Sequence, residues 1–309
     1  MNMKKLRFLS ILILVPLVLF AQYERPGSAG GQFLSIGVDP RAAGMGGAFI
    51  SVTDGAEATY YNPAAIVNVG HNALSFTHTS WFAGINHDFA AFVTNRDKIG
   101  SFGLIFTGLV TDEMEVRTPL QPDGTGETFY AGNYRFGLVY ARYMTNHVSF
   151  GGSVNYVYSS LYKDFSASAV FVDISVLYQT QFRDFRFGMK IENFGSELKF
   201  INESYPLPTN FQFGLSINAV QSESNKLLVS FAAQKPNVGK PIGSVGAEWN
   251  YKNLIYLRAG YKLNNEVQKY ALGFGLGWTF KQKRIIFNYS YSDFSLLGTV
   301  NRFGLNLGF

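Results

Sequence analysis

Residue types that commonly do chemistry are sparse in this sequence of 309 residues. Cysteine is absent, which excludes disulfide bonds, thiolate metal ligands and a cysteine nucleophile. Three of the four histidines, His71, His78 and His87, lie near one another, but at spacings of seven and nine residues. Asp88 is the one carboxylate beside them, and a zinc site needs three or four well-placed ligands. The sequence therefore predicts neither a metal site nor a bound cofactor.

Charged side chains are the other candidates for chemistry. They recur along segments in which small residues dominate: Arg135, Asp173, Arg186, Lys190, Glu192, Glu248, Arg258, Arg284 and Arg302. Such a set can imitate a catalytic cluster, but the sequence has no G-x-S-x-G nucleophile motif. We interpret these charges as a salt-bridged network inside a barrel, which holds a plug or fills the lumen. We expect no enzymatic activity and no catalytic residues.

A separate group of acids lies in the longest predicted loop. Asp112, Glu113 and Glu115 would form an acidic surface patch there. Acidic residues in such a loop either form a solvated loop tip or contact a partner or a cation. The sequence leaves both interpretations open.

The composition is typical of a membrane barrel. Charged residues make up 15% of the chain, aromatic residues make up 16%, and there are 32 glycines. In soluble domains about a quarter of all residues are charged, whereas transmembrane barrels are rich in aromatic and small residues. The formal charge is +5, but no basic run is present. We therefore do not expect nucleic acid as a partner.

Residues 1–21 have the pattern of a signal peptide. Two lysines and an arginine precede an apolar stretch from Phe8 to Phe20, and Ala21 is a suitable last residue before cleavage. The apolar stretch is too short to span a bilayer as a helix, which takes about 20 residues. We therefore expect an exported protein from which this segment is removed.

From Asn72 onward, apolar and often aromatic residues alternate with small or polar ones in segments of about ten residues. The clearest segment places Tyr270, Leu272, Phe274, Leu276, Trp278 and Phe280 on one face and small residues on the other. A soluble sandwich would instead carry lysine, glutamate and threonine on its outer face. We therefore predict an all-β fold, a transmembrane antiparallel β-barrel of about 14 strands over residues 72–309, with its apolar face toward lipid.

The predicted strands begin near Ala73, Asn86, Ile99, Tyr134, Val148, Val170, Phe185, Phe211, Leu227, Ser244, Leu254, Tyr270, Arg284 and Val300. Short connections alternate with long ones, as in outer-membrane barrels, whose short turns lie in the periplasm. Aromatic residues near the strand ends, among them Trp81, Trp249 and Trp278, are expected to form girdles at the membrane interfaces. Phe309 ends the chain on an aromatic residue, which resembles the signal read by the barrel-insertion machinery, although the alternation alone would also supply it.

The segment between the signal peptide and the strands, residues 22–71, is predicted to form a lead and a small plug in the lumen. Gly44, Gly46 and Gly47 allow close backbone approach or a positive φ. The sequence leaves open whether this plug is a fixed structural stopper or a moving gate.

Two signatures in the plug predict short helices. Asp54 and Glu57 fit a capping box before a helical turn. Asn62 and Pro63 fit an N-cap followed by proline at the first helical position. The positive end of the second helix could satisfy hydrogen-bond acceptors in the lumen.

The block from Gly37 to Ile66 carries a set of residues known from one family. The set is Asp39, Arg41, Gly44, Gly46, Gly47, Asp54, Ala58, Tyr61, Asn62, Pro63 and Ala64. It resembles the PorV/PorQ family of outer-membrane proteins, within the wider group of FadL-like barrels. The resemblance implies a plugged barrel of the predicted strand count in the outer membrane of a Gram-negative bacterium, with membrane lipid and the barrel-insertion machinery as partners.

The resemblance also implies two possible functions. Members of the PorV/PorQ family serve type IX protein secretion as accessory or attachment components, through contact with secretion-system proteins or secreted cargo. FadL-like relatives instead are channels for the uptake of fatty acids or other hydrophobic small molecules. The predicted lumenal face holds few large apolar residues, such as Phe171 and Ile286, which favours the secretion function and leaves the channel as the alternative.

Overall fold

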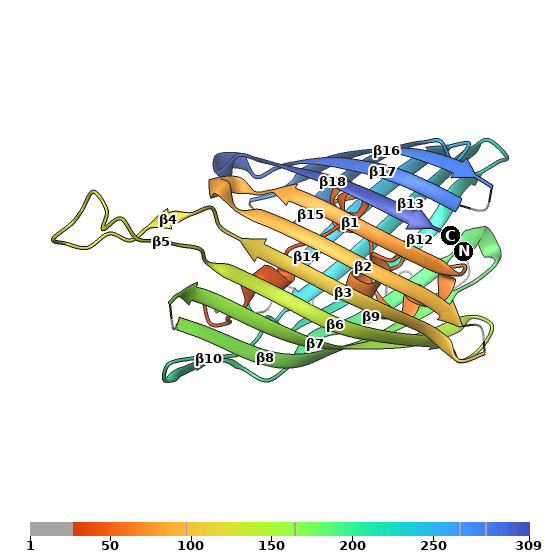
Figure 1. Cartoon of the computed structure of the whole chain (residues 1–309). Coiled ribbons are helices and arrows are strands. Elements are labelled where there is room, and N and C mark those ends of the chain that lie inside the picture. The colour runs from red at the N-terminus through yellow and green to blue at the C-terminus, as the bar shows by residue number, and fades with distance from the viewer. Residues whose placement is uncertain (1–26, 97, 164, 266, 282) are drawn as a thin grey trace, which may run out of the picture.

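A closed barrel of antiparallel strands forms the body of the molecule (Figure 1). This computed structural model describes residues 27–309 except for Asp97, Asp164, Glu266 and Gln282. The predicted signal peptide lies outside the described residues. Neighbouring strands pair antiparallel, and the first strand closes the barrel against the last.

The barrel strands are β1 (Asn72–Ser80), β2 (Asn86–Arg96), β3 (Gly100–Val110), β6 (Gly132–Tyr143), β7 (Val148–Tyr162), β8 (Phe165–Gln179), β9 (Arg186–Gly195), β12 (Asn210–Gln221), β13 (Asn225–Pro236), β14 (Ile242–Tyr251), β15 (Ile255–Leu263), β16 (Tyr270–Phe280), β17 (Lys283–Asp293) and β18 (Thr299–Gly308). The predicted count of 14 is confirmed. With one exception, each strand begins within two residues of its predicted start.

The exception is β8, which begins at Phe165 rather than near Val170. In its first residues the outward side chains are the exposed Ser166 and Ser168, while Ala167 and Ala169 face inward and are buried. The outer face of this stretch is polar, and its inner face carries small apolar residues. It therefore lacks the row of apolar outward side chains on which the prediction depended.

The two ends of the barrel differ in their connections. At the turn end, where β1 begins and β18 ends, the connections are short, and one of them contains the 3₁₀ helix η5 (Phe182–Asp184). At the opposite loop end, two long connections carry the small hairpins β4 (Met114–Glu115) with β5 (Thr128–Phe129) and β10 (Leu198–Phe200) with β11 (Glu203–Tyr205). The β4–β5 segment extends far beyond the barrel (Figure 1). The 3₁₀ helices η4 (Phe82–Gly84) and η6 (Ser295–Leu297) occupy shorter connections at the same end.

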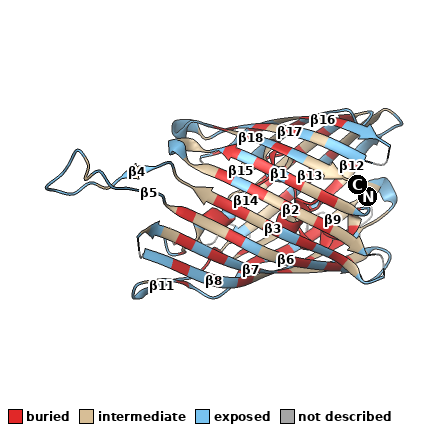
Figure 2. Ribbon diagram, viewed as in Figure 1, coloured by how far each residue is buried: buried red, intermediate tan, exposed pale blue. Residues whose placement is uncertain are grey.

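Buried and exposed residues alternate along the strands of the wall (Figure 2). As predicted, the exposed side chains are largely apolar and the buried ones are small or polar. On β16, for example, Leu272 is 60% exposed and the adjacent Ala271 is 3% exposed. Trp249 and Trp278 are exposed, in keeping with the predicted girdles. Trp81 is different, because its ring lies 5.2 Å from the guanidinium carbon of the buried Arg302.

Residues 27–71 fill the lumen from the loop end to the turn end. At the loop end, the amide of Gly30 donates to the carbonyl of Pro206 (3.0 Å). At the turn end, the hydroxyl of Tyr143 donates to the side chain of Asn68 (2.7 Å). The plug contains η2 (Gln32–Ser35), α2 (Pro40–Gly44), α3 (Ala58–Tyr61) and η3 (Pro63–Asn68). No helix among the described residues is long and apolar enough to cross a membrane.

The glycine cluster of the plug lies against glycines of the wall. A Cβ on Gly44 would lie 2.8 Å from the Cα of Gly273, and a Cβ on Gly46 would lie 2.8 Å from the backbone nitrogen of Tyr261. Gly46 and Gly47 also have φ values of 65° and 82°. The close approach of α2 to β15 and β16 therefore requires residues without side chains.

One predicted helix cap is present and the other is wrong. The side chain of Asn62 accepts a hydrogen bond from the amide of Ala64, with Pro63 at the first position of η3. The predicted capping box does not form, because α3 begins after Glu57 and has no side-chain cap. Asp54 instead forms an ion pair with Arg41 (2.8 Å), a long-range contact that outcompetes the local one.

Candidate functional site

The charges that the sequence places in the lumen do not gather in one site. Arg135, Asp173, Lys190 and Glu192 form one network, and Glu248 and Arg258 belong to a second. Arg186 pairs with Asp184 at the turn end, and Arg284 donates to the hydroxyl of Tyr256. Arg302 forms no ion pair with any described carboxylate and donates to the hydroxyl of Ser292.

The second network fixes the plug to the wall. Arg41 of α2 donates from Nε and Nη2 to the two carboxylate oxygens of Glu248 on β14, at 2.7 and 2.8 Å. Arg258 on β15 donates to the same carboxylate (2.6 Å) and to Asn288 (2.9 Å). Two parallel hydrogen bonds between a guanidinium and a carboxylate are the strong form of this pairing. This contact therefore acts as a latch between α2 and the barrel.

The first network surrounds Tyr60 of α3. Its ring lies 5.3 Å from the guanidinium carbon of Arg135 and 5.4 Å from the ammonium nitrogen of Lys190. Its hydroxyl donates to the backbone carbonyls of Leu34 and Ile36, at 2.7 and 2.8 Å. Lys190 in turn donates to the carbonyl of Tyr60 (2.5 Å). Two cations and a shared hydroxyl therefore hold the middle of the plug.

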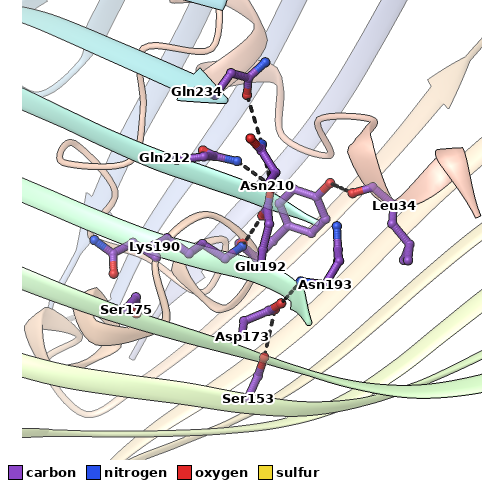
Figure 3. A network of polar contacts seen from close by, with 12 residues as sticks. Leu34, Ser153, Asp173, Ser175, Lys190, Glu192, Asn193, Asn210, Gln212 and Gln234 are labelled. Atoms are coloured by element: carbon purple, nitrogen blue, oxygen red, sulfur yellow. Dashed lines mark hydrogen bonds and ion pairs between the residues drawn. The ribbon is translucent and has the colours of Figure 1, made fainter. Parts of the chain in front are cut away.

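The acids of this network accept hydrogen bonds from several neighbouring strands (Figure 3). Asp173 accepts from Arg135 (2.9 Å), from Ser153 (2.9 Å) and from the amide of Asn193 (2.8 Å). Glu192 accepts from three further side chains, Lys190, Asn210 and Gln212. These carboxylates therefore connect β7, β8, β9 and β12 inside the barrel. The salt-bridged network predicted from the sequence is present.

The wall is interrupted beside this network. β9 and β12 are paired from Ser216–Arg186 to Asn210–Glu192 and no further toward the loop end. On the other side of β9, the register with β8 shifts between Val172 and Ile174. The extra residue is Asn193, with a φ of 59°.

Groups outside the strands satisfy the backbone at this interruption. The amide of Asn193 donates to the carboxylate of Asp173, and its carbonyl accepts from Thr209 (3.1 Å). Its side chain donates to the carbonyl of Pro208 (2.9 Å). A bulge of this kind ends regular pairing and redirects the strand. Residues 196–209 therefore cover the gap instead of a neighbouring strand.

An apolar cluster lies inside the wall at the same place. It joins Phe33 and Leu34 of the plug, Leu198 and Leu207 of the covering loop, and Phe171 of β8, all buried. Val157, Ala167 and Ala169 complete it. Strand alternation predicted Phe171 on the inner face, whereas Leu198 and Leu207 lie in a loop with no such alternation.

The turn end of the lumen holds a polar cavity of ≈ 590 Å³. Its lining includes Arg41, Glu57, Glu248, Arg258 and Arg284. Burial raises the pKa of Glu57 to about 8, with a further contribution from the nearby Asp39 and Asp54. The plug therefore separates an apolar region at the loop end from a charged region at the turn end.

The histidines do not converge. His78 forms a 2.7 Å contact with Asp88 on the outer face, whereas His87 is buried inside the wall and His71 lies at the turn end. Within the described part of the chain, no group of three or more histidines or acids could hold a metal ion. The acidic loop residues are partly engaged, since Glu113 accepts from Thr128 and Glu115 pairs with Arg117 (3.4 Å).

Several lumenal residues were missed by the sequence analysis. Tyr60, Asn155, Asn193 and Asn210 all belong to the first network. Asn155 and Asn210 occupy inward positions of strands whose alternation was recognised, so parity along the strand would have identified them. Tyr60 and Asn193 lie in irregular backbone, for which the sequence gives no such signal.

No protein-family model matches this sequence, and no curated protein matches it. Solved structures do match. The toluene transporter TbuX of Ralstonia pickettii has a TM-score of 0.60 and 16% identity, covering 88% of this chain and 97% of that chain. The toluene transporter TodX of Pseudomonas putida has a TM-score of 0.59 and 14% identity, with coverage of 88% and 96%.

A FadL homologue of Pseudomonas aeruginosa has a TM-score of 0.51 and 9% identity, covering 87% of this chain and 97% of that chain. At such low identities these likenesses show the fold and not the function. The resemblance of the plug block to the PorV/PorQ family stays a prediction. The chain has the fold of the FadL-like outer-membrane β-barrels.

Proposed function

We propose that this protein is an outer-membrane channel for hydrophobic small molecules, the alternative that the sequence left open. The fold is shared with two toluene transporters and a FadL homologue. Aromatic hydrocarbons are therefore the first class of substrate to test. The turn end would face the periplasm and the loop end the exterior, as in other outer-membrane barrels.

The observation that carries this proposal is the apolar cluster behind the interrupted wall. Regular strand pairing stops at Glu192 and Asn210, and a loop covers the gap. Phe33 and Leu34 of the plug occupy the space that an apolar molecule would take on the inside. A binding site for such a molecule needs apolar lining with few polar groups, which the cluster provides.

In this proposal the first part of the plug is the moving element. Residues 30–36 would withdraw from the cluster when a substrate enters, while the latch from Arg41 to Glu248 stays closed. The motion is small, because η2 is a single 3₁₀ turn that is joined to the core of the plug by the hydroxyl of Tyr60.

A reversible disulfide tests this proposal, since the natural chain has no cysteine. A Cβ on Gly30 would lie 3.1 Å from the Cβ of Tyr205, close to the usual disulfide range of about 3.5–4.5 Å. The double variant G30C/Y205C, oxidised in proteoliposomes, should lose most toluene uptake and regain it with reductant. The variant G30C alone, under the same oxidant, is the control.

Two outcomes would count against the proposal. Unchanged uptake in the oxidised double variant would show that residues 30–36 do not gate the channel. Absence of toluene uptake above empty liposomes by the unmodified protein would remove the channel function for this substrate class.

A second candidate is the accessory role in type IX secretion that the PorV/PorQ resemblance implies. The observation that favours it is the β4–β5 segment, which extends into solvent and carries Leu120 at 94% exposure (Figure 1). Pull-down in mild detergent, with the native protein and a variant lacking residues 113–129, tests this role. Secretion-system proteins or cargo that depend on this segment would support it, and co-purification of lipids alone would not.

Export and assembly complete the proposal. Residues 1–21 would be cleaved as a signal peptide, and Phe309 would present the barrel to the insertion machinery. Phe309 is 44% exposed at the turn end, where its backbone pairs with Asn72 (2.9 and 3.0 Å). N-terminal sequencing of the purified membrane protein would identify the cleavage position.

A further inference from the structure

A second group of polar side chains lies in the lumen away from both networks. Its centre is Arg302 on β18, which is 3% exposed. Nη1 of Arg302 donates to the hydroxyl of Ser292 (3.2 Å), and its Nε has no partner. No carboxylate among the described residues pairs with it. Arg41, Arg135 and Arg258 each donate to a carboxylate, whereas the acceptor of Arg302 is a hydroxyl on the adjacent strand β17.

The register places Arg302 in a row of buried polar residues. Thr79 on β1 is opposite Arg302, His87 on β2 is opposite Thr79, and Ser290 on β17 is opposite Arg302 from the other side. Directly opposite residues of antiparallel strands have Cβ atoms about 5 Å apart. The side chains of this row therefore face one region of the lumen.

Each member of the row has a buried polar atom without a partner. These atoms are Nε of Arg302, Oγ1 of Thr79, Oγ of Ser290 and Nδ1 of His87. Oγ1 of Thr77, two residues along β1, is also unpartnered. Buried polar groups are normally hydrogen-bonded, and leaving one unpaired costs about 1–3 kcal/mol. Five such atoms together indicate a ligand that is not part of the chain.

The charge of this region is positive. Lys262 on β15 is close enough for its charge to act on Arg302, and its ammonium group donates to Gln268 (2.7 Å) rather than to a described acid. The charge of Asp39 in the plug also acts on Arg302; one oxygen of its carboxylate accepts from the amide of Ala42 (3.0 Å), and the other, Oδ2, has no partner. Two cations against one acid leave the region with a net positive charge, which an anion that accepts hydrogen bonds would balance.

An aromatic cover closes the region toward the loop end. The ring of Trp81 lies over the guanidinium of Arg302. Phe82 and Phe294 pack against Trp81, with ring centroids at 5.1 and 5.2 Å. An anion here would be flanked by apolar surface on one side and by hydroxyl donors on the other, which suits a carboxylate attached to an aromatic ring.

We propose that Arg302, Thr79 and Ser290 form a binding site for a small carboxylate, with Trp81 in contact with the apolar part of the ligand. The guanidinium pairs with the carboxylate and the two hydroxyls donate to it. The site lies on the opposite strands from the apolar cluster, and its existence does not depend on the proposed channel function.

Calorimetric titration of the purified protein in detergent tests the site, with benzoate, acetate, phosphate and toluene as probes. The unmodified protein should bind benzoate more tightly than acetate. R302Q should weaken benzoate binding at least tenfold, and S290A should weaken it about threefold, as expected for a charged and a neutral hydrogen bond. R284Q, which changes another lumenal arginine, should bind benzoate as the unmodified protein does.

Each result has one meaning. Benzoate binding that R302Q leaves unchanged, or no benzoate binding at millimolar concentration, overturns the proposal and leaves ordered water as the partner of these atoms. Phosphate binding stronger than benzoate binding also overturns it. Equal binding of acetate and benzoate keeps Arg302 as the anion site and removes the role of Trp81. Heat-modified migration on gels checks that R302Q is a folded barrel, and S290A provides a second variant if it is not.

Discussion

The substitution Glu248→Gln probes the latch between the plug and the wall. Glu248 accepts three short hydrogen bonds from two arginines, at 2.6 to 2.8 Å. Its side chain is 6% exposed, and those of Arg41 and Arg258 are 14% and 1% exposed. A glutamine of the same shape keeps one acceptor but removes the charge, so two guanidinium groups lose their counterion.

The size of the effect follows from burial. Removing one partner of a buried ion pair destabilises a protein by about 3–5 kcal/mol, because the remaining charge is left without compensation. Glu248 lines the polar cavity, where water can partly solvate the arginines. Arg41 also keeps its contact with Asp54. We therefore expect the low end of this range, about 3 kcal/mol.

The assay is guanidinium unfolding in detergent micelles, followed by tryptophan fluorescence. The control is Glu115→Gln, which removes an exposed ion pair with Arg117 whose side chains are 55% and 66% exposed. Exposed pairs contribute about 0–1 kcal/mol, so this variant should unfold like the natural chain. Equal unfolding free energies for the two variants would refute the latch, and so would an E248Q variant that needs as much denaturant as the natural chain to release the plug.

Three further predictions concern other parts of the chain. The raised pKa of Glu57, about 8, means that the folded chain holds this proton more tightly than the unfolded chain. The contribution of Glu57 to stability is therefore complete below about pH 4.5 and is lost as the pH rises through 8. The variant Glu57→Gln should remove this loss in unfolding measured between pH 5 and 9. Gly44→Ala should destabilise the protein by about 1–3 kcal/mol in the same unfolding assay, because its methyl group would lie 2.8 Å from Gly273, whereas Gly70→Ala meets no atom within 4 Å and should be neutral. Deletion of Phe309 should lower the amount of assembled barrel in cells but not refolding of the purified chain in detergent; equal losses in both would assign Phe309 to stability instead.

The barrel could be predicted because its pattern is strong and local. Each strand repeats the same contrast between a lipid-facing apolar residue and a small lumenal one, and the short turns mark the boundaries. β8 shows where this signal ends, since Ser166 and Ser168 replace apolar residues on its outer face beyond the greasy band. The hairpins β4–β5 and β10–β11 were missed for the same reason, because short strands in polar loops have no apolar face.

The contents of the lumen were predictable in kind but not in arrangement. Strand parity identified the inward charges, but it does not show which strands the plug lies against. The pairing of Arg41 with Glu248 spans 207 residues. Arg41 also pairs with Asp54, which therefore does not form the capping box that its local sequence favours. Trp81 was expected in a girdle at the membrane interface and instead covers Arg302, because a loop residue has no parity that fixes its direction.

Under the proposed channel function, the two halves of the lumen favour a lateral route for an apolar molecule. A hydrocarbon that moved from the apolar cluster toward the turn end would enter a cavity lined by Arg41, Glu57 and Glu248, and it would displace water from charged groups without replacing their hydrogen bonds. A hydrocarbon that moved outward beside Asn193 would pass the point where the pairing of β9 with β12 has ended and reach the lipid face, where Phe194 is 66% exposed. The route to the turn end costs the free energy of desolvating these charged groups, whereas the route beside Asn193 does not. Under the proposed channel function, the latch between Arg41 and Glu248 can therefore stay closed, and a variant that weakens it should change stability more than toluene uptake.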